Sequence, residues 1–245
     1  MDVTAVQLGL FLAATFAAAL VAGVTGFAFA LIAAAVWLHF LSPLQTVTLT
    51  IGYGLIVQGY GFWRMRHAFD WSRVWPYLAG GVPGIAIGIQ VLRWANPAHL
   101  RMGIAVFLVL YAIYSLTRPA LRPIEGGTAA DVAVGFFSGL LGSMAGFPGI
   151  LIVIWCSLRG CSRDVQRAVF QPVSVGVLAI SAVALAATGS ISVGTIMLFL
   201  IGLPALALGT WAGFALYGRI DDGTIRKIVL WLLLAAGVFL FASVW

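Results

Sequence analysis

Two stretches of this chain, residues 3–63 and residues 168–218, contain no Lys, Arg, Asp or Glu. A helix that spans a membrane needs only about 20 apolar residues. Each stretch is therefore long enough to cross a bilayer more than once, and it must fold back to do so. Because only 8% of all residues are charged, the chain cannot cover a water-facing surface as a soluble domain does. The pattern predicts an all-α, polytopic membrane protein.

The net charge of +6 does not indicate a nucleic-acid partner. The basic residues are scattered over short segments between apolar stretches, which is typical of topology signals rather than of one phosphate-binding face. The N-terminus lacks the basic region of a cleaved signal peptide, so we expect the first helix to be retained. Cys156 and Cys161 are interpreted as small hydrophobic residues, because a metal site needs more ligands. We expect no metal, no cofactor, and a location in a bacterial inner membrane.

Three motifs recur in the same order about 120 residues apart: a Gly-rich turn that ends in Gly-Phe, a Gly-x-Pro motif, and an apolar residue followed by Arg. The matching pairs are 22–27 with 142–147, 81–88 with 202–209, and 100–101 with 225–226. Internal similarity at a nearly constant offset indicates duplication. The sequence thus divides into a first transmembrane repeat (1–118), a linker loop (119–129) and a second transmembrane repeat (130–245).

Each repeat contains one apolar segment interrupted by glycines, followed by three uninterrupted apolar spans. The predicted segments are 6–40, 44–63, 74–92 and 102–117 in the first repeat, and 132–158, 168–187, 193–217 and 227–244 in the second. If each interrupted segment crossed once, five basic residues would lie on one side and eight on the other. If each is a hairpin without net crossing, the division becomes eleven against two.

Cytoplasmic loops are enriched in Lys and Arg, so the hairpin topology is favoured. It leaves three net crossings in each repeat, and the second repeat then runs upside down relative to the first, with both termini outside. Inverted repeats of this kind are the plan of many secondary transporters.

The glycines inside the two hairpins are the strongest indication of a binding site, because non-helical backbone at membrane depth is tolerated only where it is buried or lines a cavity. They separate arms of about 17 and 14 residues in the first repeat and about 10 and 9 in the second. Pro148 is expected to start a new helix at its first turn. Helix N-termini that point at the membrane centre would bind an anion without a buried charged side chain.

Polar residues in and after the breaks supply further candidate ligands. The predicted substrate-binding residues are Gly23, Thr25, Gly26, Phe27, Gln45, Thr50, Ser143, Gly146, Phe147 and Gln171. Ser174 lies on the same predicted helix as Gln171, and Arg167 lies at its mouth, where it either attracts anions or acts as a topology signal. The alternative is that the glycines only allow close helix packing and that the hydroxyls bond their own backbone.

Motifs for enzyme catalysis are missing from the sequence. No Asp or Glu falls inside a predicted span, which argues against a carboxylate proton relay. The chain contains no Gly-x-Ser-x-Gly elbow, no Walker loop and no His-Glu-x-x-His, and Ser138 has no histidine base in its repeat. The sequence therefore predicts that the protein is not an enzyme.

The Ala-Gly-x-x-Gly-Phe break, its repeat at 142–149, the Gly-x-Pro helix of each repeat and the Leu-Arg/Ile-Arg pairs resemble the TauE/SafE sulfite-exporter family over essentially the whole chain. The resemblance implies transport of small sulfur-containing anions such as sulfite, sulfonates or sulfoacetate-like compounds. The chain departs from the family by a Thr-Gly-Phe-Ala sequence at 25–28, where many members have a denser run of glycines. The expected partners are this anion, the lipid bilayer and, as an option, a second copy in a homodimer. An anion channel of the same architecture and a membrane scaffold remain alternatives.

Overall fold

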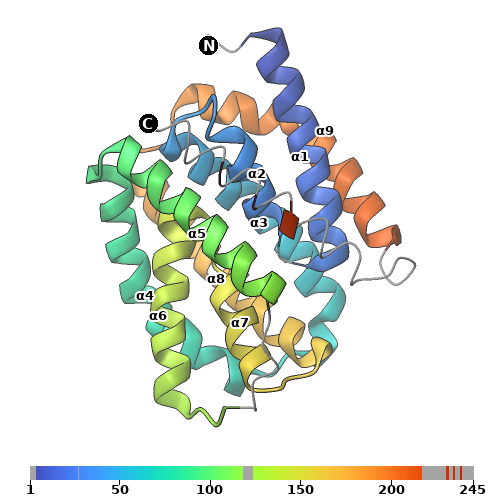
Figure 1. Ribbon diagram of the computed structural model, residues 1–245, viewed down its shortest axis with the longest axis vertical. Coiled ribbons are helices and arrows are strands. Elements are labelled where there is room, and N and C mark those ends of the chain that lie inside the picture. Colours follow the sequence, from blue (N-terminus) through green and yellow to red (C-terminus); the bar gives the residue numbers. More distant parts are fainter. Residues whose placement is uncertain are drawn as a thin grey trace. The chain divides into compact units, whose positions relative to one another are not determined.

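The computed structural model describes residues 4–26, 28–117, 124–216 and the single positions 230, 231, 234 and 238. In these residues all regular structure is helical (Figure 1). The elements are α1 (Ala5–Thr25), α2 (Phe29–Trp37), α3 (Pro43–Met65), a short 3₁₀ turn (Arg66–Ala68), α4 (Trp71–Trp94), α5 (Pro97–Thr117), α6 (Thr128–Ala145), α7 (Ile150–Leu158), α8 (Arg163–Ala187) and α9 (Val193–Leu216). The last predicted span, 227–244, lies almost entirely outside the described residues.

Six of these helices are long and apolar enough to cross a membrane: α1, α4, α5, α6, α8 and α9. The all-helical, multi-pass membrane class predicted from the charge-free stretches is confirmed. α3 is long enough but is not among the six, because threonines, glutamines and glycines dilute its apolar character. α2 and α7 have nine residues each, about half of what a span requires.

The helices form two compact units, and each unit draws on both sequence repeats. The first unit contains residues 1–50, 95–119 and 191–245, and the second contains residues 51–94 and 120–190. α3 is divided between them after Thr50. The sequence repeats are therefore not the units within which the helices pack.

Glycines hold the closest helix pair of each unit together. In the second unit, a Cβ added at Gly84 of α4 would run into the Phe136 carbonyl of α6, and one at Gly139 of α6 into the Gly81 carbonyl of α4. In the first unit, a Cβ at Gly213 of α9 would run into the Leu20 carbonyl of α1. Small residues let helix backbones approach closely in membranes, where no hydrophobic effect drives association.

In Figure 1 α4 runs beside α6, and α1 crosses α9; each of these two pairs lies within one unit, and the pairs correspond to each other in the repeat. α4 and α9 carry the matching Gly-x-Pro motifs, and α1 and α6 carry the matching breaks. Each unit therefore joins the broken helix of one repeat to the Gly-x-Pro helix of the other.

Both interrupted segments fold back on themselves. The ring of Phe11, near the start of α1, stacks on Trp37 at the end of α2, with 4.9 Å between ring centroids. Asp131, in the first turn of α6, accepts a hydrogen bond of 2.7 Å from Nε1 of Trp155 in α7. Phe11 and Asp131 each lie 15 positions before the left-handed glycine of their own segment.

The lengths of the hairpin arms differ from the sequence prediction. The arms have 21 and 9 residues in the first repeat and 18 and 9 in the second. The predicted 9-residue arm at 150–158 is confirmed as α7, and the other three lengths were wrong. The prediction counted each whole glycine cluster as break, began the first arm of the second repeat at 132 instead of Thr128, and continued the second arm of the first repeat past Trp37 to residue 40. Gly23 and Gly142 are helical, and each helix ends only at a glycine with positive φ, Gly26 (92°) or Gly146 (80°).

The membrane orientation of the two repeats remains a prediction, and the exposed loops make it testable. Ser42 follows the first hairpin and is exposed, and His67 lies at the other end of α3 and is also exposed. In a background with Cys161→Ser, we expect Ser42→Cys to react with a membrane-impermeant maleimide added to intact cells. His67→Cys should react only after the cells are opened. Labelling of the two positions in the reverse pattern contradicts the hairpin topology.

Candidate functional site

The first break lies between α1 and α2. Gly26 ends α1, and its N–H donates to the Ala22 carbonyl at 2.6 Å. α2 begins at Phe29 after Ala28, and no side chain caps its N-terminus. Phe27 lies outside the described residues. The break thus consists of a left-handed glycine followed by a helix start whose first N–H groups have no partner within the helix.

The second break has the same order of parts. Gly146 ends α6, and its N–H donates to the carbonyls of Gly142 and Leu141. Phe147 is buried, and α7 begins at Ile150 with Gly149 as its uncapped N-cap. Pro148 precedes the N-cap, so the prediction that it starts the helix was wrong, because the turn after Gly146 needs two more residues. The N-terminus of α7 carries the positive end of its helix dipole.

Three of the predicted hydroxyl ligands donate to their own helices. The Oγ atoms of Thr25, Thr50 and Ser143 donate to the carbonyls of Val21, Val47 and Gly139 at 2.9 Å each. Each hydroxyl has one proton, so in this arrangement none of the three donates to an anion. The alternative noted from the sequence, that membrane hydroxyls bond their own backbone, describes them here.

Two other predicted residues, Gly23 and Gln45, and again Ser143 serve the packing and capping of the helices. Gly23 faces Gly213 of α9, where a Cβ would lie 2.8 Å from backbone atoms. Ser143 is directed toward Gly88 of α4. Oε1 of Gln45 accepts hydrogen bonds from the N–H and the hydroxyl of Ser42, and the Gln45 N–H donates back to the Ser42 hydroxyl, so the pair forms a capping box at the start of α3.

Buried polar atoms without a hydrogen-bond partner occur in both units, and three of them lie in the second unit. Within the part of the chain that the structure describes, Oγ of Ser138, Oε1 of Gln171 and Oγ of Ser174 have no hydrogen-bond partner, and these three residues are at most 2% exposed. Ser174 lies beside the second break, because a Cβ added at Gly149 would be 3.0 Å from its Oγ. Buried polar atoms are normally satisfied by protein or by another polar molecule. Gln171 and Ser174 therefore remain candidate ligands of the anion.

A charged cluster connects the two arms of the second hairpin at the end opposite its break. Asp131 accepts hydrogen bonds from the Tyr77 hydroxyl (2.7 Å) and Trp155, and it pairs with the Arg159 guanidinium at 3.1 Å. The prediction that no carboxylate lies inside a span was wrong here, because α6 begins at Thr128 and so includes Asp131. A carboxylate in the first turn also complements the helix dipole. These partners come from α4 and from the α7 arm, so Asp131 fixes the hairpin.

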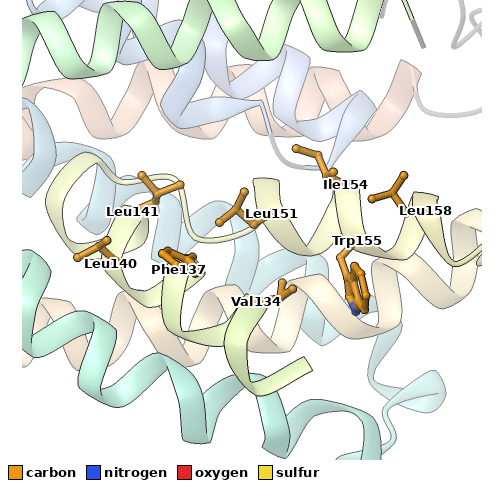
Figure 2. A pocket seen from close by; sticks show the side chains of 8 residues that line it. All are labelled: Val134, Phe137, Leu140, Leu141, Leu151, Ile154, Trp155 and Leu158. Atoms are coloured by element: carbon orange, nitrogen blue, oxygen red, sulfur yellow. The ribbon is translucent and has the colours of Figure 1, made fainter. Parts of the chain in front are cut away.

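A cavity of about 380 Å³ lies between α6 and α7, and Figure 2 shows the side chains that line it. They are Val134, Phe137, Leu140, Leu141, Leu151, Ile154, Trp155 and Leu158. The one polar atom among these side chains, Nε1 of Trp155, is already bonded to Asp131. An anion would lose its hydration there without gaining donors, so this cavity is not the anion site.

Comparison with known proteins gives one match. The family model described as "Sulfite exporter TauE/SafE" matches residues 10–240, nearly the whole chain. Neither the search of curated proteins nor the search of solved structures gave a match.

Proposed function

Because the chain belongs to the TauE/SafE family of sulfite exporters, a family of membrane transporters, we propose that it is a secondary transporter that moves small sulfur-containing anions across a bacterial inner membrane. The anions are sulfite, sulfonates or sulfoacetate-like compounds, and they bind at the Gly-rich breaks. The observation that carries the proposal is an uncapped helix N-terminus beside a buried hydroxyl without a partner, Gly149 with Ser174.

The chemistry of the breaks favours an anion held without a charged side chain. A helix N-terminus offers free N–H groups and about half a positive charge. Neutral donors bind an anion strongly enough to replace its water, yet they do not trap it as a buried arginine would. A carrier needs this balance, because it has to release its substrate on the other side of the membrane.

The proposed site residues have different roles in the two breaks. Gly26 and Gly146 end the first arms and so set where α2 and α7 begin. Phe27 and Phe147 follow them, and Gln171 contributes its amide. Gly23, Thr25, Gln45, Thr50 and Ser143 support the helices around the breaks through the contacts described above.

Counterflow in proteoliposomes tests the proposed function. We expect vesicles preloaded with unlabelled methanesulfonate or sulfite to accumulate external labelled substrate transiently, whereas vesicles preloaded with acetate accumulate much less. A carrier shows this trans-stimulation because its loaded form reorients with the substrate. Flux without trans-stimulation would identify an anion channel, and the absence of flux for every sulfur anion would favour a scaffold. Either result contradicts the proposal.

A further inference from the structure

One face of α8 carries three polar residues in a row, called the polar stripe here. Arg167, Gln171 and Ser174 follow each other at i, i+4 and i+7, so they share one face of the helix. The exposed fraction falls to 2% at Gln171 and 0% at Ser174. Seven residues of helix place Arg167 about 10 Å from Ser174 along the axis. The stripe therefore leads from a basic residue to a fully buried hydroxyl.

α3 presents a matching face to this stripe. A Cβ added at Gly61 would lie 2.5 Å from Nε2 of Gln171, and one at Gly54 would lie 3.0 Å from a methyl group of Leu178. These two contacts run in opposite directions along the helices, so α3 and α8 are antiparallel. Gln58 lies between the two glycines on the same face of α3, which places it at the level of Ser174. Gln58 is 8% exposed.

The N-terminus of α7 is adjacent to this level. Gly149, its N-cap, approaches α8 at both Phe170 and Ser174. A Cβ at Gly149 would lie 3.3 Å from a ring carbon of Phe170 and 3.0 Å from Oγ of Ser174, so a capping side chain at this position would be tightly crowded. The hydroxyl proton of Ser174 and the first N–H groups of α7 are thus neighbouring donors to which the described residues supply no side-chain acceptor.

We propose that Ser174, the amides of Gln58 and Gln171, and the N-terminus of α7 form a subsite for the –SO₃⁻ group, built entirely within the second unit. The assignment rests on the proposed transport function. Its donors are neutral apart from the partial charge of the helix dipole. The desolvation cost of an ion rises steeply with its charge, so such a subsite selects a monoanion, a sulfonate or hydrogensulfite, over the dianion sulfate.

Ser174→Ala tests the subsite in the purified full-length protein. Binding of labelled methanesulfonate should weaken about 10- to 100-fold, which is the usual effect of losing a hydrogen bond to a charged group. The melting temperature should stay the same or rise, because the substitution removes a buried hydroxyl that has no partner in the protein. Sulfate should compete with methanesulfonate at least tenfold less well than hydrogensulfite does.

Ser181→Ala is the matched control. Ser181 is equally buried on α8, but its hydroxyl already donates to the Val177 carbonyl. We expect Ser181→Ala to bind methanesulfonate like the wild type. If the wild type binds methanesulfonate and Ser174→Ala binds it equally well, the subsite is wrong while the transport function stands. If the wild type binds neither methanesulfonate nor hydrogensulfite, the proposed function itself is contradicted.

Discussion

Gly84→Ala should leave little or no folded protein, although it adds only one methyl group. That methyl group would run into the Phe136 carbonyl of α6 and come within 2.9 Å of the Leu140 backbone nitrogen. Backbone atoms cannot rotate away as the end of a side chain can, so α4 and α6 would have to move apart at this contact. Overpacking of this kind costs about 3 kcal/mol, and in a membrane no hydrophobic effect returns the separated helices to contact. Size-exclusion chromatography in detergent, followed over a temperature series, measures the loss.

Gly59→Ala is the control for this substitution. Gly59 is also a helical glycine of the second unit, but a Cβ there meets nothing within 4 Å. The control should match or exceed wild-type thermal stability, because alanine favours the helix by up to about 1 kcal/mol over glycine. If Gly84→Ala and Gly59→Ala unfold at the same temperature, the close packing of α4 on α6 is wrong.

Gly146→Ala should reduce transport by about tenfold or more while the protein remains folded. Gly146 has a φ of 80°, which costs an alanine about 1 to 2 kcal/mol. The chain relieves this strain by continuing α6 through residue 146. A continued helix pairs or displaces the N–H groups at the start of α7, and methanesulfonate counterflow should then fall by about tenfold or more.

Gly189→Ala separates the strain from the function. Gly189 has a φ of 63° in the turn after α8, and a Cβ there meets nothing within 4 Å. Both substitutions therefore impose the same backbone strain, yet only Gly146 lies at a break. Counterflow by Gly189→Ala should stay near the wild-type rate. Equal losses in the two variants would mean that general destabilisation, and not the break, explains the effect.

The helices could be predicted well because hydrocarbon leaves a chain few alternatives. Every backbone N–H and C=O must be paired inside the segment, so a charge-free stretch of sufficient length is a helix. α3, α4 and α9 begin and end within three residues of their predicted bounds. α5, α6 and α8 begin at Pro97, Thr128 and Arg163, which is earlier than the predicted starts at 102, 132 and 168. Their N-terminal turns include charged residues, at which the apolar pattern stops but the helix does not.

The site could be predicted only in part, since the sequence shows which residues are present but not which atoms are already bonded. The glycine clusters predicted the region of each break, but only the backbone conformation shows that the helices end at Gly26 and Gly146. The hydroxyls of Thr25 and Ser143 looked equally suitable, but their protons are taken by carbonyls one turn earlier. Gln58, the proposed amide donor of α3, was not among the predicted residues. Its position opposite α8 follows only from the contacts of the glycines at 54 and 61, which mark the face of α3 that meets α8.

The exchange of partners between the repeats also has a consequence for biosynthesis. α1 packs on α9, and α4 packs on α6. Both α1 and α4 are therefore synthesised before the helix on which they pack. The order of synthesis is thus not the order of assembly. A truncated chain that ends after the first repeat would expose the glycine faces of α1 and α4 to lipid with nothing to dock on them. Two separately expressed repeats, in contrast, contain between them every partner, and would assemble by complementation.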